Sequence, residues 1–485
     1  MNVSEPTPTA VPPFDLSRPR RVHVVAVGGA GMSAIATLLA EGGHAVSGSD
    51  LAEGPNLAPL RAMGVEVHIG HRADNVGNAE VVVASTAVSN ENVELTEATR
   101  RGLPVLRRRA FLASFAAQTP FLSVAGTHGK TTTSSLLAVA LRGAGTDPSW
   151  LLGAPVPALG GAASLGKGPW MVLEADESDA SFLAGPRAGA LLTNAEPDHL
   201  EFWGGWENLA HGFEEFIKGT SGPVVACADD PGSAALGRPF GAVLYGSEHS
   251  GSTERELAYE LTDLHLHALG SRFTLRSPQG SHEVHLALAG AHNALNAVGA
   301  LALAGELGVD LEAASAALST HTGLHRRFEY RGSTAGIDVV DDYAHLPTEV
   351  RAALAAGSDG GWNRLVVVFQ PHRYSRTEAL WGEFGASFGL ADVLVLTDIY
   401  AAGEAPRDGV SGRLVLDAVK ASDGREPIWA PTLPEAAQEL LGILSPGDLL
   451  LTVGAGDVRD VGDMVLEALA AGADAGTRDG NRGEV

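Results

Sequence analysis

The sequence predicts an α/β fold made of three successive α/β domains, and three observations support this prediction. The chain has 485 residues, which is too many for one ordinary hydrophobic core. Short apolar segments typical of strands alternate with helical segments along the chain, as in parallel sheets with helical crossovers. Two of these strands run directly into glycine-rich turns that open helices, a pattern typical of doubly wound sheets.

Each domain follows from its own run of strands. In the first run we expect strands at 23–27, 45–49, 65–69, 81–85 and 105–106. The second run has expected strands at 121–125, 171–174, 189–193 and 224–227, shorter alternating segments at 240–290, and a helix at 293–307. In the third run the expected strands are 336–341, 364–370, 393–398 and 448–453. The predicted organisation is a flexible arm at 1–20, domains at 21–115, 116–322 and 323–470, and a disordered tail at 471–485.

Composition excludes several classes of protein. The formal net charge of −25 repels DNA, RNA and anionic lipid, so a nucleic-acid partner is not expected. Cys227 is the only cysteine, which rules out an intramolecular disulfide and a thiolate zinc cluster and agrees with a reducing compartment. The N-terminal segment lacks the order of a signal peptide, and no apolar run is long enough to span a bilayer. We expect a soluble, cytoplasmic protein without membrane insertion.

The strongest local signal is a phosphate-binding loop in the second domain. Between a strand and a helix stands Gly126-Thr127-His128-Gly129-Lys130-Thr131-Thr132. The glycines allow backbone N–H groups to face phosphate oxygens, and the helix N-terminus adds positive potential. Lys130 can reach the β- and γ-phosphates, and Thr131 can hold Mg²⁺. Val124 occupies the place of the usual first glycine, so the loop is shorter than in most nucleotide hydrolases.

The first domain has a second glycine-rich turn, Gly28-Gly29-Ala30-Gly31. A dinucleotide-binding pattern would need a glycine at position 26, where the chain has Ala26. Asp50 ends the next strand and is placed to meet a ribose or a base. The turn therefore favours a pyrophosphate-bearing ligand other than NAD, although a simple packing turn is the bland alternative.

Polar side chains also follow the later strands. Four acids occur in the segment Glu174-Ala175-Asp176-Glu177-Ser178-Asp179, and His199 closes Thr193-Asn194-Ala195-Glu196-Pro197-Asp198-His199. Beside a phosphate loop they favour a Mg²⁺ site at the carboxyl end of the sheet. Further candidates are the amides in His292-Asn293 and Asn296, the pair Arg326-Arg327, the segment Asp341-Asp342-Tyr343-Ala344-His345, and Phe369-Gln370-Pro371-His372-Arg373-Tyr374-Ser375-Arg376.

These motifs, in this order, resemble the Mur ligase family over nearly the whole chain. The first loop, continued by Met32-Ser33, resembles the UDP-sugar loop of the family's alanine-adding branch, and His128 gives the phosphate loop the form typical of that branch. The resemblance implies a Rossmann-like UDP-binding domain, a central P-loop ATPase domain and a C-terminal Rossmann-like domain that brings the amino acid. It implies that UDP-N-acetylmuramate and L-alanine are joined at the expense of ATP.

The resemblance also implies roles for individual residues. The catalytic residues would be Lys130, Glu174, His199 and Arg327. Mg²⁺ (or Mn²⁺) would be bound by Thr131, Glu174 and His199. ATP would be bound by Gly126, Thr127, His128, Gly129, Lys130, Thr131, Thr132, Asn293, Asn296, Arg327 and Asp341. The UDP-sugar would be bound by Gly28, Gly29, Ala30, Gly31, Met32, Ser33, Asp50, His71, Ser85 and Thr86. The amino acid would be bound by Tyr343, His345, His372, Arg373 and Arg376.

The chain departs from the family's pattern at several positions. Ala26 replaces a glycine, Ala291 replaces a basic residue before His292, and Leu346 stands where a second histidine is frequent. Other members carry a carbamylated lysine about fifteen residues after the metal-binding histidine, a region occupied here by Glu214 and Glu215. We expect a native carboxylate to do that electrostatic work, without carbamylation.

Three other functions compete with alanine addition. The nearest is a recycling ligase that attaches a ready-made tripeptide to UDP-N-acetylmuramate. A nicotinamide-dependent oxidoreductase is disfavoured by Ala26 and by the separate phosphate loop. A nucleotide-sensing protein without catalysis is disfavoured by the joint presence of Lys130, Glu174 and His199. The expected partners are small molecules only, with the protein a monomer or a weak dimer.

Overall fold

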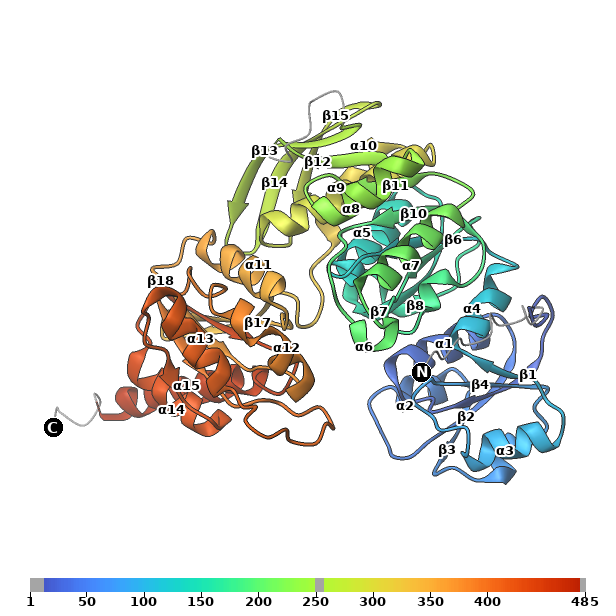
Figure 1. The fold of residues 1–485 in the computed structure, drawn as a ribbon, viewed down its shortest axis with the longest axis horizontal. Coiled ribbons are helices and arrows are strands. Elements are labelled where there is room, and N and C mark those ends of the chain that lie inside the picture. The colour runs from blue at the N-terminus through green and yellow to red at the C-terminus, as the bar shows by residue number, and fades with distance from the viewer. Residues whose placement is uncertain (1–12, 249–256, 480–485) are drawn as a thin grey trace. The chain divides into compact units, whose positions relative to one another are not determined.

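A computed structural model describes residues 13–248 and 257–479 of the chain. It contains three sheets, which occur one after another along the sequence (Figure 1). The predicted fold of three successive α/β domains is confirmed by these sheets and their helices. By contacts the chain divides into two units: unit 1 comprises Met1–Thr262, Thr274–Val284 and Leu295–Thr320, and unit 2 comprises Asp263–Phe273, His285–Ala294 and His321–Val485.

The first sheet is parallel, with strand order β3-β2-β1-β4-β5. Its strands are β1 (Arg21–Val25), β2 (Ala45–Asp50), β3 (Glu66–Ile69), β4 (Val81–Ala84) and β5 (Val105–Arg107). Its helices are α1 (Ala30–Glu41), α2 (Leu57–Ala62), α3 (Val93–Arg100) and α4 (Arg108–Ala116), with a 3₁₀ turn η1 at Ala73–Val76. Strand order reverses at β1, so the loops after β1 and β4 lie where α/β proteins of this topology bind ligands.

The N-terminal arm is ordered where the structure describes it, so its expected flexibility is wrong for that part. Leu16 is buried in the core of the first domain, and Phe14 packs against the same core. The backbone N–H of Phe14 also donates to Ser114 Oγ at 2.9 Å. Apolar burial of these two side chains offsets the entropy of ordering the segment. The remainder of the predicted arm, residues 1–12, lies outside the described residues.

The central sheet has ten strands in the order β15-β14-β13-β12-β11-β10-β6-β9-β7-β8. Its strands are β6 (Phe121–Ala125), β7 (Ser149–Val156), β8 (Gly161–Ser164), β9 (Met171–Glu174), β10 (Arg187–Leu192), β11 (Val224–Cys227), β12 (Val243–Ser247), β13 (Tyr259–His267), β14 (Gly270–Ser277) and β15 (Gly280–Leu286). Its helices are α5 (Lys130–Gly143), α6 (Leu200–Trp203), α7 (Trp206–Lys218), α8 (Pro231–Gly237), α9 (Ala291–Glu306) and α10 (Leu311–Ala317). Strand β6 lies between β10 and β9 and is parallel to both, so the carboxyl ends of these three strands are neighbours.

The third sheet belongs to unit 2 and has the order β16-β17-β21-β18-β19-β20. Its strands are β16 (Glu329–Thr334), β17 (Ile337–Asp342), β18 (Arg364–Phe369), β19 (Val393–Leu396), β20 (Ile428–Trp429) and β21 (Asp448–Val453). Its helices are α11 (Pro347–Ser358), α12 (Tyr374–Phe384), α13 (Arg413–Asp423), α14 (Leu433–Ile443) and α15 (Arg459–Asp479). One buried cluster joins the sheet to α11, α12 and α13, and a second joins it to α14 and α15.

The C-terminal segment differs from the prediction. Residues 471–479 continue helix α15 where a disordered tail was expected. The reason is that Ala-rich sequence has a high helix propensity and here extends a helix already anchored on the sheet by Val461 and Val465. Residues 480–485 lie outside the described residues. No helix in the described ranges is long and apolar enough to cross a membrane.

Candidate active site

The phosphate loop connects β6 to α5 and depends on glycine at two positions. Gly126 has φ +139°, and a Cβ atom there would lie 2.1 Å from Thr193 Oγ1. Gly129 has φ +75°, and a Cβ atom there would lie 2.9 Å from Asn296 Oδ1. Both backbone conformations disfavour L side chains, and neither position has room for one. The loop therefore has the shape that a phosphate cradle needs.

The segment after β10 fastens this loop in place. Thr127 Oγ1 donates to the carbonyl oxygen of Glu196 at 3.1 Å and accepts from the N–H of Glu196 at 2.9 Å. The backbone N–H of His128 donates to Asn194 Oδ1 at 2.7 Å, and His128 Nε2 lies 3.0 Å from Glu196 Oε2. Asn194 and Glu196 are thus loop-positioning residues. The sequence pattern had shown them only as members of a polar strand end.

Lys130 begins helix α5 and folds back over the loop. Its Nζ donates to the carbonyl oxygens of Gly126 and Thr127 at 2.7 and 3.1 Å, and to Glu177 Oε1 at 2.9 Å. Burial lowers the pKa of Lys130, but the neighbouring carboxylates of Glu177 and Asp176 outweigh burial and raise it. Lys130 therefore carries its positive charge at the mouth of the cradle. Glu177, its buried counter-ion, is a further site residue. From the sequence it could not be told apart from the other acids of its segment.

The proposed metal ligands are only partly brought together. Thr131 Oγ1 donates to Glu174 Oε1 at 2.9 Å, and the other carboxylate oxygen of Glu174 accepts from the N–H of Gly153 at 2.6 Å. His199 precedes α6 with φ 52°, and its Nε2 lies 3.4 Å from Asp198 Oδ2. Within the described ranges, no group of three His, Cys, Asp or Glu side chains forms a ready-made metal site. A hydroxyl and a carboxylate side by side do fit Mg²⁺, which takes few protein ligands and completes its shell with phosphate and water oxygens.

The two asparagines of α9 have different environments. Asn296 lies against Gly129 of the phosphate loop, so the helix presents an amide directly to the cradle. Asn293 is buried, and its Nδ2 donates to the carbonyl oxygen of Ala289 at 2.8 Å. Asn296 belongs to unit 1 and Asn293 to unit 2. Thr132, in the first turn of α5, is also buried.

The glycine-rich turn of the first domain is closed by polar contacts. The N–H of Gly28 donates to Asp50 Oδ2 at 2.8 Å, and Asn56 Nδ2 donates to the carbonyl oxygen of Gly28 at 2.8 Å. Ala26 has φ 62°, the left-handed conformation that a glycine adopts without strain. The turn thus keeps its shape despite the alanine, and Gly29 leads into α1 as its N-cap. Asp50 shapes the turn, a role that its position at a strand end did not reveal.

The other candidates for the UDP-sugar are placed unevenly around this turn. The Met32 side chain is buried in the hydrophobic core, so only its backbone could face a ligand. Ser33 Oγ donates to the carbonyl oxygen of Ala30 at 3.0 Å, within the first turn of α1. Thr86 is exposed, and the carbonyl oxygen of Ser85 accepts a hydrogen bond from Arg107 at 2.5 Å. Arg107 therefore fixes the loop after β4, which the sequence had not indicated. Arg108 approaches Gly31 in the same crevice: its guanidinium lies 3.6 Å from where a Cβ on that glycine would be.

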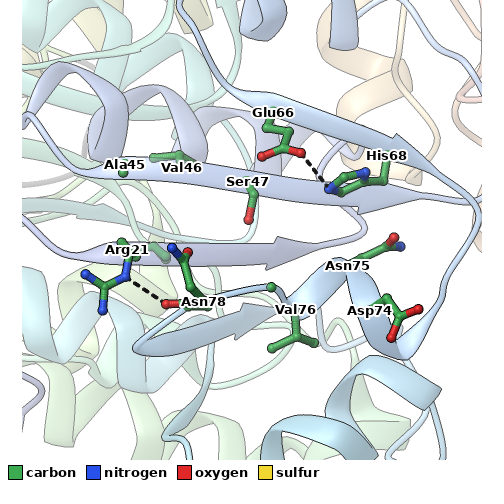
Figure 2. Close-up of a pocket in the computed structure, with 13 residues that line it drawn as sticks. Arg21, Ala45, Val46, Ser47, Glu66, His68, Asp74, Asn75, Val76 and Asn78 are labelled. Atoms are coloured by element: carbon green, nitrogen blue, oxygen red, sulfur yellow. Dashed lines mark hydrogen bonds and ion pairs between the residues drawn. The ribbon is translucent and has the colours of Figure 1, made fainter.

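A cavity of about 260 Å³ lies in the same domain, but at the opposite end of the strands (Figure 2). It is lined by the first residues of β1 and β2, by residues of β3, and by the segment before β4. Figure 2 shows His68 facing Glu66, with His68 Nε2 3.5 Å from Glu66 Oε1, and Arg21 donating to the carbonyl oxygen of Asn78 at 2.8 Å. Most of its lining thus comes from the starts of the strands, whereas the ligand is predicted at their carboxyl ends.

In unit 2, four of the five residues predicted for the amino acid form one cluster. The rings of Tyr343 and His345 are 5.4 Å apart, and those of His345 and His372 are 6.0 Å apart. Arg376 donates to His372 Nδ1 at 3.1 Å. The ring of Tyr400, which follows β19, stacks on His372 at 5.7 Å. Tyr400 was missed, although its place after a strand of the same sheet was a usable signal.

Both histidines of this cluster stay neutral near pH 7. Burial lowers the pKa of His372 to about 4, assisted by the positive charge of Arg376. Burial also lowers the pKa of His345. The carboxylate of Glu349 raises this pKa, and the charge of Arg376 lowers it further. Two neutral imidazoles beside the arginine leave its positive charge available for a carboxylate.

Arg326 and Arg327 both lie over the ring of Tyr343, Arg326 at 4.9 Å, but they pair with different carboxylates. Arg326 donates to Asp341 Oδ2 at 3.1 Å and to the carbonyl oxygen of Gly454 at 2.6 Å. Arg327 lies over the ring of Tyr343, at 5.4 Å, and 3.7 Å from Glu349 Oε1. Asp341 is thus paired with Arg326 in this structure, and Arg327 borders the histidine cluster. Burial and the charge of Arg327 lower the pKa of His292 to about 4, so this histidine is neutral as well.

Arg373 is exposed and precedes α12 with φ 68°. Two residues on, Ser375 donates to Glu404 through its N–H at 2.9 Å and its hydroxyl at 2.6 Å, which holds the start of α12. Glu214 and Glu215 were the expected substitutes for a carbamylated lysine. On α7 Glu214 is half-buried and Glu215 exposed, and they pair with Lys218 at 3.2 and 3.4 Å.

This combination defines a class: three α/β domains with a phosphate loop at the centre, a glycine-rich ligand loop before it and an Arg/His cluster after it. The chain belongs to the Mur ligase family. Residues 21–119 match the "Mur ligase family, catalytic domain", residues 124–304 the "Mur ligase middle domain", and residues 326–456 the "Mur ligase, glutamate ligase domain".

Particular proteins resemble the chain along most of its length. The UDP-N-acetylmuramate–L-alanine ligase of Desulforamulus reducens is 43% identical over 459 residues, covering 93% of this chain and 98% of that protein. The structure of the UDP-N-acetylmuramate–alanine ligase of Thermotoga maritima has a TM-score of 0.75 at 30% identity, covering 93% of this chain and 100% of that one. A murein peptide ligase of Psychrobacter arcticus shares the fold, with a TM-score of 0.64 at 22% identity and 93% and 98% coverage.

Proposed function

We propose that this protein joins L-alanine to the carboxylate of UDP-N-acetylmuramate and converts ATP to ADP and phosphate. The observation that carries the proposal is the phosphate loop, where Lys130 keeps its charge over the cradle and Thr131 meets Glu174. The choice of substrates rests on the relatives that bear this activity in their names and match nearly the whole chain. We place the protein in the cytoplasm, in the synthesis of peptidoglycan precursors.

The chemistry requires the carboxylate to be activated before the amide forms. A carboxylate is a poor acyl donor, so its oxygen first attacks the γ-phosphorus of ATP and displaces ADP. The free amine of alanine then attacks the carbonyl carbon of the acyl phosphate, and the tetrahedral intermediate releases phosphate. Lys130 stabilises the charge on the transferring phosphoryl group. Closure of the third domain would exclude water, which would otherwise hydrolyse the acyl phosphate.

Mg²⁺, or Mn²⁺ in its place, belongs to the proposal. Thr131 and Glu174 would hold one ion, and His199 would contribute to a second. Bound there, the ions would neutralise phosphate charge that this acidic protein otherwise repels.

The remaining roles are proposed by position. Asn293 and Asn296 would bind the adenine, and Arg327 and Asp341 would contribute to the ATP site. The Tyr343, His345, His372 and Arg376 cluster, with Arg373, would bind alanine. The turn at 28–33, with Asp50, His71, Ser85 and Thr86, would bind the UDP-sugar.

A phosphate-release assay with UDP-N-acetylmuramate and a panel of amino acids tests this proposal. We expect release with L-alanine that depends on both UDP-N-acetylmuramate and ATP. The tripeptide L-alanyl-γ-D-glutamyl-meso-diaminopimelate should be included in the panel. Turnover with the tripeptide and none with alanine would reject alanine addition in favour of a recycling ligase.

A further inference from the structure

A buried carboxylate organises one side of the first domain's ligand crevice. Glu94, in the first turn of α3, is fully buried. Its Oε2 accepts from Ser49 Oγ at 2.6 Å and lies 3.0 Å from His71 Nδ1. Its Oε1 accepts from Asn75 Nδ2 at 2.6 Å and from the N–H of Arg72 at 3.3 Å. The donors come from the end of β2 and from the segment after β3, so one side chain ties these two strand ends together.

Counting protons around Glu94 fixes the tautomer of His71. An ionised carboxylate only accepts hydrogen bonds, and a serine hydroxyl has one proton to give. Ser49 gives that proton to Glu94 at 2.6 Å, so Ser49 Oγ can only accept from His71 Nδ1, which lies 3.1 Å away. Both neighbours of Nδ1 are therefore acceptors, and Nδ1 must carry the hydrogen. A neutral His71 then has a lone pair on Nε2.

The backbone holds His71 at the carboxyl end of the first sheet. Gly70 follows β3 directly, and its N–H donates to the carbonyl oxygen of Asp50, the last residue of β2, at 2.7 Å. The carbonyl oxygen of Gly70 accepts from Asn75 Nδ2 at 2.9 Å. The His71 side chain is 14% exposed, and Nε2 makes no hydrogen bond within 13–248 and 257–479. His71 therefore offers a single fixed acceptor on the side of the crevice where Asp50 holds the glycine-rich turn.

We propose that Glu94 is a positioning residue for the nucleoside of the UDP-sugar, holding His71 as the Nδ1–H tautomer so that Nε2 accepts a hydrogen bond from the ligand. The donors that uridine offers are its ribose hydroxyls and the N–H of the uracil ring. The inference rests on the proposed function for the identity of the ligand, but the tautomer rests on the geometry alone. Glu94 itself touches no ligand and acts through His71.

Nitrogen-15 NMR of the histidine side chains in the full-length protein tests the tautomer directly. At pH 8.5 His71 should show a protonated Nδ1 and an unprotonated Nε2. Its signals are assigned by their loss in His71→Gln. A His71 that is protonated on Nε2 would overturn the inference. This measurement needs neither substrate nor turnover.

Titration with UDP tests the ligand contact. The Nε2 resonance of His71 should shift as UDP binds, because a new hydrogen bond changes the shielding of that nitrogen. An unshifted Nε2 in a protein saturated with UDP would overturn the proposed contact. If the tautomer and the UDP shift are found but no amino acid supports phosphate release, the proposed function fails and the inference stands.

Kinetics separate positioning from a merely structural role. Glu94→Gln keeps the shape of the side chain but loses acceptor capacity, so His71 is no longer confined to one tautomer. We expect the KM for UDP-N-acetylmuramate to rise roughly ten-fold, the value of about one hydrogen bond. The KM for ATP and alanine should change less than about two-fold. The matched control is Glu97→Gln, on the same helix, whose carboxylate accepts two hydrogen bonds from Arg100 near the surface. Equal increases in all three KM values would reject the positioning role.

Discussion

Acid should destabilise the first domain chiefly through the buried carboxylate of Glu94. Burial alone would raise the pKa of Glu94, but the buried His23 ring, 3.7 Å away, and hydrogen bonds from Ser49 and Asn75 outweigh burial and lower the pKa from 4.5 to about 2. A carboxylate whose folded-state pKa is lowered stabilises the fold above its unfolded pKa and loses that contribution as the pH falls through the folded value. The difference of about 2.5 in pKa corresponds to about 3 kcal/mol at pH 7. By pH 3, about 2 kcal/mol of this contribution should be lost.

The measurement is a comparison of wild type with Glu94→Gln, which cannot titrate at this position. Hydrogen–deuterium exchange of peptides from β1 to β5, corrected for the intrinsic pH dependence of exchange, gives the opening free energy of the first domain. The wild type should exceed the variant at pH 7, and the difference should shrink by about 2 kcal/mol between pH 7 and pH 3. Glu97→Gln should show a weaker trend, because Arg100 lowers the pKa of Glu97 too, but near the surface, where solvent screens the interaction. A difference that stays constant with pH would mean that Glu94 is not the group responsible.

The other predictions concern the proposed reaction. Lys130→Ala should abolish ligation and leave UDP-N-acetylmuramate binding nearly intact, because the hydrogen bonds of Lys130 go to the phosphate loop and Glu177 in the central domain; calorimetric titration showing lost binding in a folded variant would contradict this. Turnover should require Mg²⁺ or Mn²⁺, and full activity in excess chelator would reject the roles of Thr131 and Glu174. Arg373→Ala should raise the KM for alanine tens-fold or more, since a charged hydrogen bond to its carboxylate is worth about 2–5 kcal/mol, and should change the KM for ATP much less. An unchanged alanine KM would place the amino-acid site elsewhere.

The sequence was sufficient to predict a site where its residues lie close together in one stretch of the chain. The strand and loop around Gly126 and Lys130 could be read because a strand, a glycine turn and a helix are consecutive in the chain. The same holds for His372 and Arg376, one helical turn apart and in contact in the structure. Signals failed where a residue acts on a distant segment. Glu94 has the sequence context of an ordinary acid in a helix's first turn, and nothing beside it indicates that it binds Ser49 and His71.

The sequence by itself determined the three α/β domains, the ligand-bearing strand ends and the family, because strand and helix periodicity and short motifs are local properties. Only the tertiary structure decided which partners the polar residues have. It paired Asp341 with Arg326 and Glu349 with Arg327, it placed Asp50 on Gly28, and it extended α15 through residues 471–479. The physical reason is that a buried charge must find its hydrogen bonds wherever the fold supplies them. Residues far apart in sequence meet only when strand order and register are set, and single-chain motifs do not encode that order.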